Sequence, residues 1–149
     1  MRIAIDCDDA AFDFKDAIYA HLKEEGYDIT DLKYSETHEC DYPDIAFNLA
    51  EKVADKTYDR GILICGTGLG VAMMANKVPG AFAGTCSDTY AAERLAKSND
   101  ANIITMGARC IGVELGKMIA DAYLNSEFAG GGSTRKVSRM RELEKTYMK

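Results

Sequence analysis

Apolar and polar positions along the chain fall into two alternating patterns. Short apolar runs occur at residues 2–6, 27–32, 60–64, 81–86 and 102–106. Runs of this length are typical of buried strands, and longer segments with helical spacing separate them. Alternating strands and helices with short connections predict a parallel sheet covered on both faces. We therefore expect an α/β fold, a doubly wound three-layer sandwich with five parallel strands.

The helical segments are recognised by their apolar spacing and by their first residues. Asp41-Tyr42-Pro43 predicts a helix start, with the Asp41 side chain as cap and Pro43 in the first turn. Ser87 is expected to cap a helix that runs through Lys97. The apolar stripes that define the other segments are Phe14, Ala17, Ile18 and Leu22; Ile45, Leu49 and Val53; residues 71–75; and residues 113–124.

The last twenty residues differ in character from the rest. Three glycines, Gly130 to Gly132, precede a charged segment, 134–148, whose apolar stripe is thin: Met140, Leu143 and Tyr147. We expect residues 1–149 to form a single domain in which residues 130–149 are a tethered helix. This helix is expected to pack on something other than its own sheet, and to extend to a partner subunit.

Composition narrows the class of protein. The net charge of -6 argues against a nucleic-acid surface, which needs an excess of Lys and Arg. No apolar run approaches the roughly 18 residues of a membrane span, and the start lacks the apolar stretch of a secretory signal, so a cytosolic protein is expected. Five cysteines without a C-x-x-C pair, beside two histidines, argue against a structural zinc site and against a disulfide framework.

The most informative segment is Ile64-Cys65-Gly66-Thr67-Gly68-Leu69-Gly70. It places a thiol at the carboxyl end of a central strand, where open α/β sheets bind ligands. Glycines at alternate positions let the backbone turn tightly and bring several N–H groups toward one negative charge. These features favour a reaction centre over the simpler interpretation, a small buried cysteine packed at a tight turn.

Known signatures that resemble this segment do not fit it. The spacing G-x-G-x-G differs from the dinucleotide fingerprint G-x-G-x-x-G, and no Gly-Lys-Ser/Thr follows as in a phosphate-binding P-loop. A cysteine phosphatase loop needs an Arg where Val71 stands. The acidic cluster Asp6, Asp8 and Asp9 would suit a phospho-receiver, but that fold needs an Asp in place of Cys65.

Other polar and thiol groups are predicted at the same edge of the sheet. Cys7 and Cys86 also end strands, and they are expected to be small wall residues of the cleft because no glycine-rich turn follows either. Asp8 and Asp9 follow the first strand. Asp9 is interpreted first as a helix cap and second as a substrate contact.

Several motifs together resemble the ribose-5-phosphate isomerase B and galactose-6-phosphate isomerase family. The motifs, in chain order over the whole sequence, are Cys7-Asp8, Asp41-Tyr42-Pro43, Cys65 to Gly70, Asn76-Lys77-Val78-Pro79-Gly80, Asn99-Asp100 and Gly107-Ala108-Arg109. The resemblance implies the doubly wound fold predicted above, a homodimer with an active site shared between subunits, and interconversion of aldose and ketose phosphates. It implies no metal and no organic cofactor.

The resemblance also implies roles for individual residues. Cys65 would be the base that removes a proton from carbon, and Thr67 would relay a proton between the two substrate oxygens. Backbone N–H groups would stabilise the cis-enediolate. These N–H groups belong to Gly66, Gly68, Leu69 and Gly70; Asp8 and Asn99 would hold substrate hydroxyls; and Tyr42 would close the cleft.

The chain departs from the family pattern where the sugar ring and the phosphate are handled. Family members commonly carry His where this chain has Asp9, and a ring-opening His where it has Ser98. Of two tail arginines, one is replaced by Gly132 and the other by Lys136, which lacks the bidentate fork of Arg. Arg135 or Arg139 would then compensate; alternatively, these cations form a solvated helix face.

Ser98 also bears on the substrate. A pentose 5-phosphate closes to a furanose and gains from a ring-opening residue, whereas a tetrose 4-phosphate has its O4 esterified and cannot close that ring. Ribose 5-phosphate is the default substrate, with erythrose 4-phosphate and erythrulose 4-phosphate as the alternative pair. A sugar-phosphate-binding subunit without activity and a redox-sensing thiol protein remain open as other classes.

Overall fold

Five parallel strands form the centre of the molecule. The computed structural model describes residues 1–148. The strands are β1 (Arg2–Cys7), β2 (Asp28–Asp31), β3 (Arg60–Cys65), β4 (Ala83–Thr85) and β5 (Ile103–Gly107), in the order β2-β1-β3-β5-β4. All pairings are parallel, which confirms the predicted five-stranded sheet. The strand order reverses between β1 and β3, so the carboxyl ends of these two strands form the switch point at which such sheets bind ligands.

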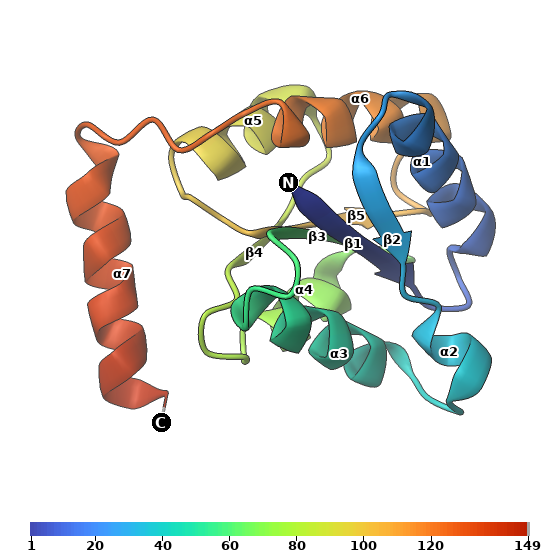
Figure 1. The fold of residues 1–149 in the computed structure, drawn as a ribbon, viewed down its shortest axis with the longest axis horizontal. Coiled ribbons are helices and arrows are strands. Elements are labelled where there is room, and N and C mark those ends of the chain that lie inside the picture. The colour runs from blue at the N-terminus through green and yellow to red at the C-terminus, as the bar shows by residue number, and fades with distance from the viewer. Residues whose placement is uncertain (149) are drawn as a thin grey trace.

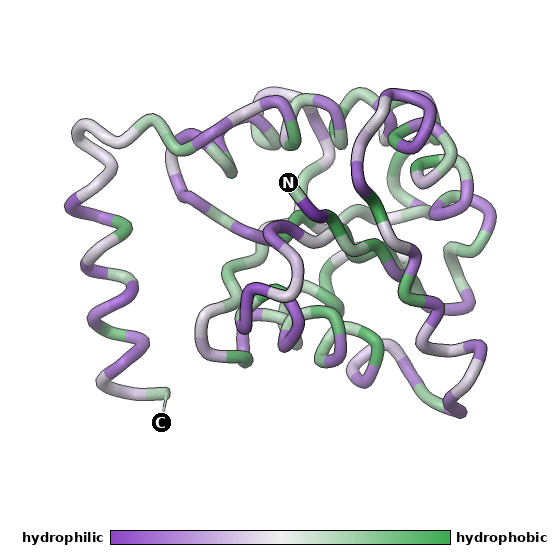
Figure 2. Tube along the Cα trace, viewed as in Figure 1, coloured by the Kyte–Doolittle hydropathy of each residue, from purple (hydrophilic) through white to green (hydrophobic). Residues whose placement is uncertain are grey.

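Helices cover both faces of this sheet (Figure 1), as predicted. One face carries α1 (Phe12–Glu24), α5 (Thr89–Lys97) and α6 (Val113–Leu124), and the other carries α3 (Tyr42–Ala54) and α4 (Leu69–Ala75). Successive strand residues enter opposite cores, because side chains alternate across a sheet: Ile62 and Ile64 pack on the first face and Leu63 on the second. The apolar stretches of the chain accordingly lie along the strands and inner helix faces (Figure 2).

Three local predictions were wrong in detail. The helix α5 is capped by Asp88, not Ser87, because the Asp88 carboxylate accepts the Ala91 N–H and Ser87 precedes it in the loop. Asp9 is no helix cap: α1 follows Ala11, which makes no side-chain cap bond. The strand β4 is shorter than the predicted 81–86, and the short helix α2 (Tyr34–Thr37), which buries no residue, was not predicted.

The start of α3 was predicted correctly. Asp41 and Asp44 form a capping box, in which each carboxylate accepts the backbone N–H of the other residue, and Pro43 lies in the first turn. The apolar stripe Ile45, Leu49 and Val53 is fully packed, with each side chain at most 1% exposed. The helix therefore holds Tyr42 at a fixed place beside the sheet.

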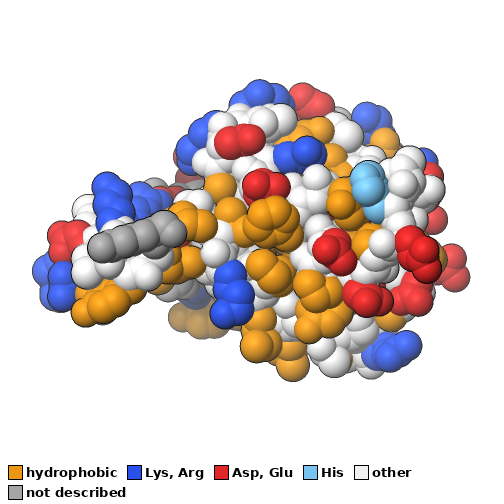
Figure 3. Space-filling model, turned by 90° about the horizontal axis from the view of Figure 1, so that it is seen from below, with side chains coloured by type: hydrophobic (Ala, Val, Ile, Leu, Met, Phe, Trp, Pro, Cys, Tyr) orange, Lys and Arg blue, Asp and Glu red, His pale blue; other side chains and the backbone are white. Residues whose placement is uncertain are grey.

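The C-terminal helix α7 (Ser133–Tyr147) lies beyond the β4 edge of the sheet and covers neither face (Figure 1). Its ties to the domain include an Arg141–Asp100 ion pair of 2.7 Å, the Arg141 guanidinium over the Phe82 ring, and a hydrogen bond of 3.0 Å that the Gly80 N–H donates to Glu144. Val137 is its one buried residue among those described. Seen from the α3 and α4 side, α7 forms a separate lobe (Figure 3).

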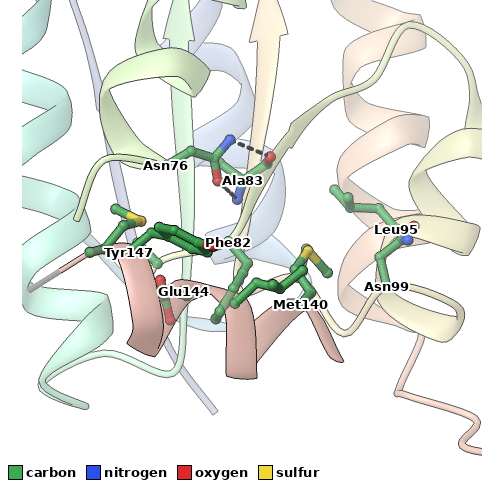
Figure 4. A pocket seen from close by; sticks show the side chains of 12 residues that line it. Asn76, Phe82, Ala83, Leu95, Asn99, Met140, Glu144 and Tyr147 are labelled. Carbon is green, nitrogen blue, oxygen red and sulfur yellow. Dashed lines mark hydrogen bonds between the residues drawn. The ribbon is translucent and has the colours of Figure 1, made fainter. Parts of the chain in front are cut away.

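An apolar groove of about 520 Å³ runs between α7 and the domain. Met140 and Tyr147 of the helix face Phe82 and Leu95 across it (Figure 4), and Leu143 also lines it. The thin stripe noted in the sequence therefore lines a groove that its own chain leaves partly open. That α7 extends to a partner subunit stays a prediction. Within residues 1–148, none of the helices combines the length and apolar character needed to cross a bilayer.

Candidate active site

The turn after β3 folds back onto the cysteine thiol. The Cys65 side chain is 6% exposed, and its sulfur accepts the Gly68 N–H at 3.1 Å. Gly68 has φ +80°, and a Cβ there would lie 2.8 Å from the Met106 carbonyl carbon. Only glycine satisfies both conditions, so this position is what directs the Gly68 N–H at the sulfur.

Hydroxyl groups from the neighbouring strands hold the turn in place. The Gly68 carbonyl accepts hydrogen bonds from Thr105 at 2.7 Å and from Thr85 at 3.1 Å. Gly107 lets the turn approach β5, since a Cβ there would lie 2.6 Å from the Thr67 backbone. Sequence reasoning missed these two threonines, because no local pattern indicates which loop a strand hydroxyl will meet.

Thr67 and Leu69 are both exposed at the mouth of the turn, and the Leu69 N–H donates to the Thr67 hydroxyl at 3.2 Å. Tyr42 lies against the same turn: a Cβ on Gly70 would be 2.5 Å from the tyrosine ring. The Thr67 hydroxyl can both accept and donate a proton there, which a relay requires. Thr67, Leu69, Gly70 and Tyr42 are therefore brought together as the sequence suggested.

Beside Tyr42 lies a cavity of about 370 Å³ whose lining includes the polar side chains of Asp8, Asp9, Ser35, Asp41 and Tyr42 and the Cys40 thiol. Burial is the main cause that raises the pKa of Asp8, and the nearby Arg109 guanidinium opposes it. Asp8 and Asp9 thus stand next to the turn, where a polyhydroxy substrate would meet them.

Arg109 is a functional candidate to which the sequence assigned no role. Its Nη1 atom lies 3.4 Å from the place that a Cβ on Gly66 would occupy, and its backbone N–H donates to the Gly66 carbonyl at 2.9 Å. The exposed guanidinium therefore sits at the mouth of the cysteine turn, where it adds a fixed positive charge. The sequence signal that could have identified Arg109 was its place in the motif Gly107-Ala108-Arg109, at the end of the fifth strand.

Ser98 and Asn99 lie at the amino ends of the strands, whereas Cys65 lies at the carboxyl ends. They follow α5, which returns from the carboxyl end of β4 to the amino end of β5. The Ser98 hydroxyl accepts a hydrogen bond from Arg94 Nε at 2.9 Å, and Asn99 lines the groove below α7. A single chain does not bring these two residues to the cysteine turn.

The three tail cations are likewise outside the cleft of their own chain. Arg135, Lys136 and Arg139 are exposed on the first turns of α7, and Arg139 pairs with Glu142 at 3.0 Å. Within one chain they form a solvated helix face, which is one of the two interpretations of the sequence. The other interpretation, in which these cations hold the substrate phosphate, requires a second copy of the chain.

Cys7 and Cys86 are core residues. They are 0% and 4% exposed, and burial raises the pKa of Cys7 to about 12 and that of Cys86 to about 11. Both thiols therefore stay protonated at neutral pH and cannot act as thiolate bases. They share an edge with Cys65, as predicted, but they belong to the core on the α1 side and not to the cleft wall.

Comparison with known proteins agrees with this geometry. The Ribose/Galactose Isomerase family matches residues 3–140. The chain belongs to this family. It is 48% identical to the D-erythrulose-4-phosphate isomerase of Pectobacterium atrosepticum over 94% of this chain and 93% of that protein. It is 46% identical to the ribose-5-P isomerase B of Listeria innocua over 97% of both.

A solved structure extends the likeness to three dimensions. The ribose-5-phosphate isomerase B of Clostridium thermocellum has a TM-score of 0.92 with this chain, at 41% identity and 99% coverage of both chains. The family assignment made from the motifs and the fold class predicted from the apolar pattern are both confirmed. In this domain the Tyr42 ring lies against Gly70 of the cysteine turn and, with Asp8, lines the cavity beside it.

Proposed function

We propose that this protein interconverts an aldose phosphate and a ketose phosphate through a cis-enediolate, with Cys65 as the base. The observation that carries the proposal is the sulfur of Cys65 set 3.1 Å from the Gly68 N–H, inside a glycine-rich turn that Thr85 and Thr105 hold in place. The chain's membership of an isomerase family and the names of both relatives support it.

The reaction needs a proton moved between neighbouring carbons. The Cys65 thiolate takes the proton from C2 of the aldose, and the electrons of that C–H bond form the enediolate C1–C2 double bond while the carbonyl bond shifts its electrons to O1. Thr67 passes the O2 proton to O1, and the thiol returns its proton to C1, which leaves the ketose. Backbone N–H groups of Gly66, Gly68, Leu69 and Gly70 stabilise the negative oxygen, and stabilisation of this kind usually lowers the barrier of such reactions more than any other effect.

The phosphate needs cations that a single cleft supplies only in part. Arg109 provides one from the same chain. We assign the others to Arg135, Lys136 and Arg139 of a second copy, since α7 stands away from its own sheet. Asp8 and Tyr42 then contact the sugar from one subunit, and Asn99 contacts it from the other.

This division of residues favours a homodimer. The α4 side of the domain exposes Leu69 at 57% and Met73 at 68%, on a face where apolar side chains gather (Figure 3). The groove under α7 adds Phe82 and Met140 to the apolar surface that a second copy would cover.

Cysteines that are all free in residues 1–148 suit a reducing compartment, and we place the enzyme in the cytoplasm.

Two substrates are in question. Ribose 5-phosphate and ribulose 5-phosphate are the default pair, in keeping with the name of the Listeria relative. Erythrose 4-phosphate and erythrulose 4-phosphate are favoured by Ser98, whose hydroxyl is engaged by Arg94 and whose position carries no ring-opening group. The Pectobacterium relative, named for the tetrose, supports this second candidate.

A panel of four-, five- and six-carbon aldose and ketose phosphates, compared by kcat/KM, tests the function and chooses the substrate. Turnover of any of them establishes the isomerase. Ribose 5-phosphate exceeding both tetroses by orders of magnitude would exclude the second candidate, and Ser98→His should raise pentose activity if the tetrose is the natural substrate. Binding without turnover would show a sensor, and neither binding nor turnover would point to a redox protein.

A further inference from the structure

Asp6 is a buried carboxylate at the edge of the active site to which the reaction assigns no task. It is the residue before the last of β1, it is 2% exposed, and it ties two stretches of backbone together. Its Oδ1 accepts the Cys7 N–H at 2.8 Å, and its Oδ2 accepts the Tyr34 N–H at 3.1 Å. The carboxylate therefore bridges β1 and the chain that leaves β2, at the point where the two separate and the strand ladder ends.

The segment that this bridge holds forms one wall of the cavity beside the cysteine turn. We call residues 34–40 the α2 wall; Ser35 and Cys40 of this wall line the cavity together with Asp8 and Asp9. The helix within it is one turn long and fully buries no residue; Tyr34 and Cys40 of the wall pack, half-buried, against the core on the α3 side. Beside this packing, the charge-assisted hydrogen bond from the Tyr34 N–H to Asp6 fixes the end of the wall that leaves β2.

We propose that Asp6 is a positioning residue, whose carboxylate fixes the α2 wall against the substrate-binding cavity. The inference rests on the proposed function, because the wall matters only if a sugar phosphate occupies that cavity. Cys65 lies on another strand, so loosening the wall weakens substrate binding more than it slows the chemical step.

The surroundings of Asp6 make the bridge sensitive to pH. Burial is the main cause that raises the pKa of Asp6 to about 6; the two backbone hydrogen bonds and Lys15 of α1 lower it, and Asp31 of β2 raises it. Lys15 is already committed to ion pairs with Asp31 and Asp16, so it does not neutralise Asp6 fully. Two thiols are also titratable neighbours, and both stay neutral: burial raises the pKa of Cys7 to about 12, and burial, with nearby carboxylates that include Asp6, raises the pKa of Cys40.

Protonation of Asp6 stabilises the folded state but weakens the hydrogen bonds through which Asp6 holds the α2 wall. A carboxyl whose pKa is raised by folding favours the folded state most when it is protonated, so its contribution is lost as the pH rises from 3.8 through about 6. Above about pH 6 Asp6 is charged; this form accepts the two N–H bonds best, but the protein is then less stable than with a protonated Asp6. A purely structural carboxylate would lose stability and function together when it is neutralised.

Asp6→Asn separates these roles, because an amide keeps the shape but turns one acceptor into a donor that faces an N–H group. At pH 8 we expect KM for the best sugar phosphate to rise about three- to tenfold, with kcat changed less than about twofold and Tm not lowered. The ratio of the variant's KM to that of the wild type should fall toward one by pH 5, with a midpoint near pH 6. Using the ratio cancels the titration of the substrate phosphate, whose second pKa is also about 6.

Asp31→Asn is the matched control, because the Asp31 side chain is a buried neighbouring carboxylate that pairs with Lys15 and is not bonded to the α2 wall. It should lower Tm and leave KM unchanged. Amide hydrogen exchange at pH 8 gives a readout that needs no substrate: residues 34–40 should exchange faster in Asp6→Asn, while β5 stays protected. A KM ratio that is flat between pH 5 and pH 8, or unchanged exchange in the wall, would overturn the proposal. If the wild type turned over no sugar phosphate, the proposed function would fail, and exchange alone would decide the role of Asp6.

Discussion

Gly68→Ala is the substitution that most directly tests how the cysteine turn is built. Gly68 has φ +80°, which costs an alanine about 1 kcal/mol. The new Cβ would also lie 2.8 Å and 2.9 Å from the Met106 carbonyl carbon and oxygen, so backbone must move, which costs about 1–3 kcal/mol more. The sum, about 2–4 kcal/mol, should lower Tm by about 5–15 °C in a domain of this size.

The same shift moves the Gly68 N–H away from the sulfur and from the place of the enediolate oxygen. Loss of one such donor should lower kcat by about 10²–10³-fold. Thermal unfolding followed by circular dichroism gives Tm, and initial isomerisation rates give kcat.

Gly26→Ala is the matched control for this variant. Gly26 has φ +92°, and a Cβ there would meet no atom within 4 Å, so it carries the strain of the positive φ without the clash. It should lower Tm by about 2–4 °C and leave kcat unchanged. A Gly68→Ala protein that loses no more stability than Gly26→Ala, or whose kcat stays within a few-fold of the wild type, would refute this view of the turn.

Three further predictions address the tail, the core and the phosphate. Removing residues 130–149 should lower both self-association, measured by light scattering, and substrate affinity; a truncated protein that stays dimeric with unchanged KM would contradict the shared site. Lys15→Met leaves Asp31 buried without its cation and should cost about 3–5 kcal/mol in urea unfolding, against less than about 1 kcal/mol for the control Lys117→Met, whose ion pair is at the surface. Arg109→Gln should raise KM by about tenfold or more with a smaller change in kcat, and an unchanged KM would remove Arg109 from the phosphate site.

The sheet and its site edge could be predicted because the signals for them are local. Each strand is a short apolar run, so Cys65 could be placed at a strand end before any neighbour was known. The capping box at Asp41 and Asp44 is also complete within four residues. Boundaries were less well predicted at Ser87, where two adjacent cap formers, Ser87 and Asp88, compete and only geometry decides between them.

The parts that could not be predicted depend on contacts between distant segments. Thr105 and Thr85 hold the Gly68 carbonyl from two other strands, and no sequence spacing links them to the turn. Asp6 looked like one of three acids at a strand end, yet its partner is the N–H of Tyr34, 28 residues away. Ser98 and Asn99 were grouped with the site by resemblance, and the fold of one chain places them at the other edge.

The central claim is that Cys65 is the carbon base, and turnover by Cys65→Ala measures it most directly. The isomerisation rate of this variant should fall by at least about 10³-fold, while its fold and its affinity for the sugar phosphate, measured by calorimetry, stay close to those of the wild type. Cys86→Ala, which removes a buried thiol at the same sheet edge, should keep a rate near that of the wild type. Near-wild-type turnover in Cys65→Ala would contradict this claim, and Asp8 or Asp9 would then be the base to test.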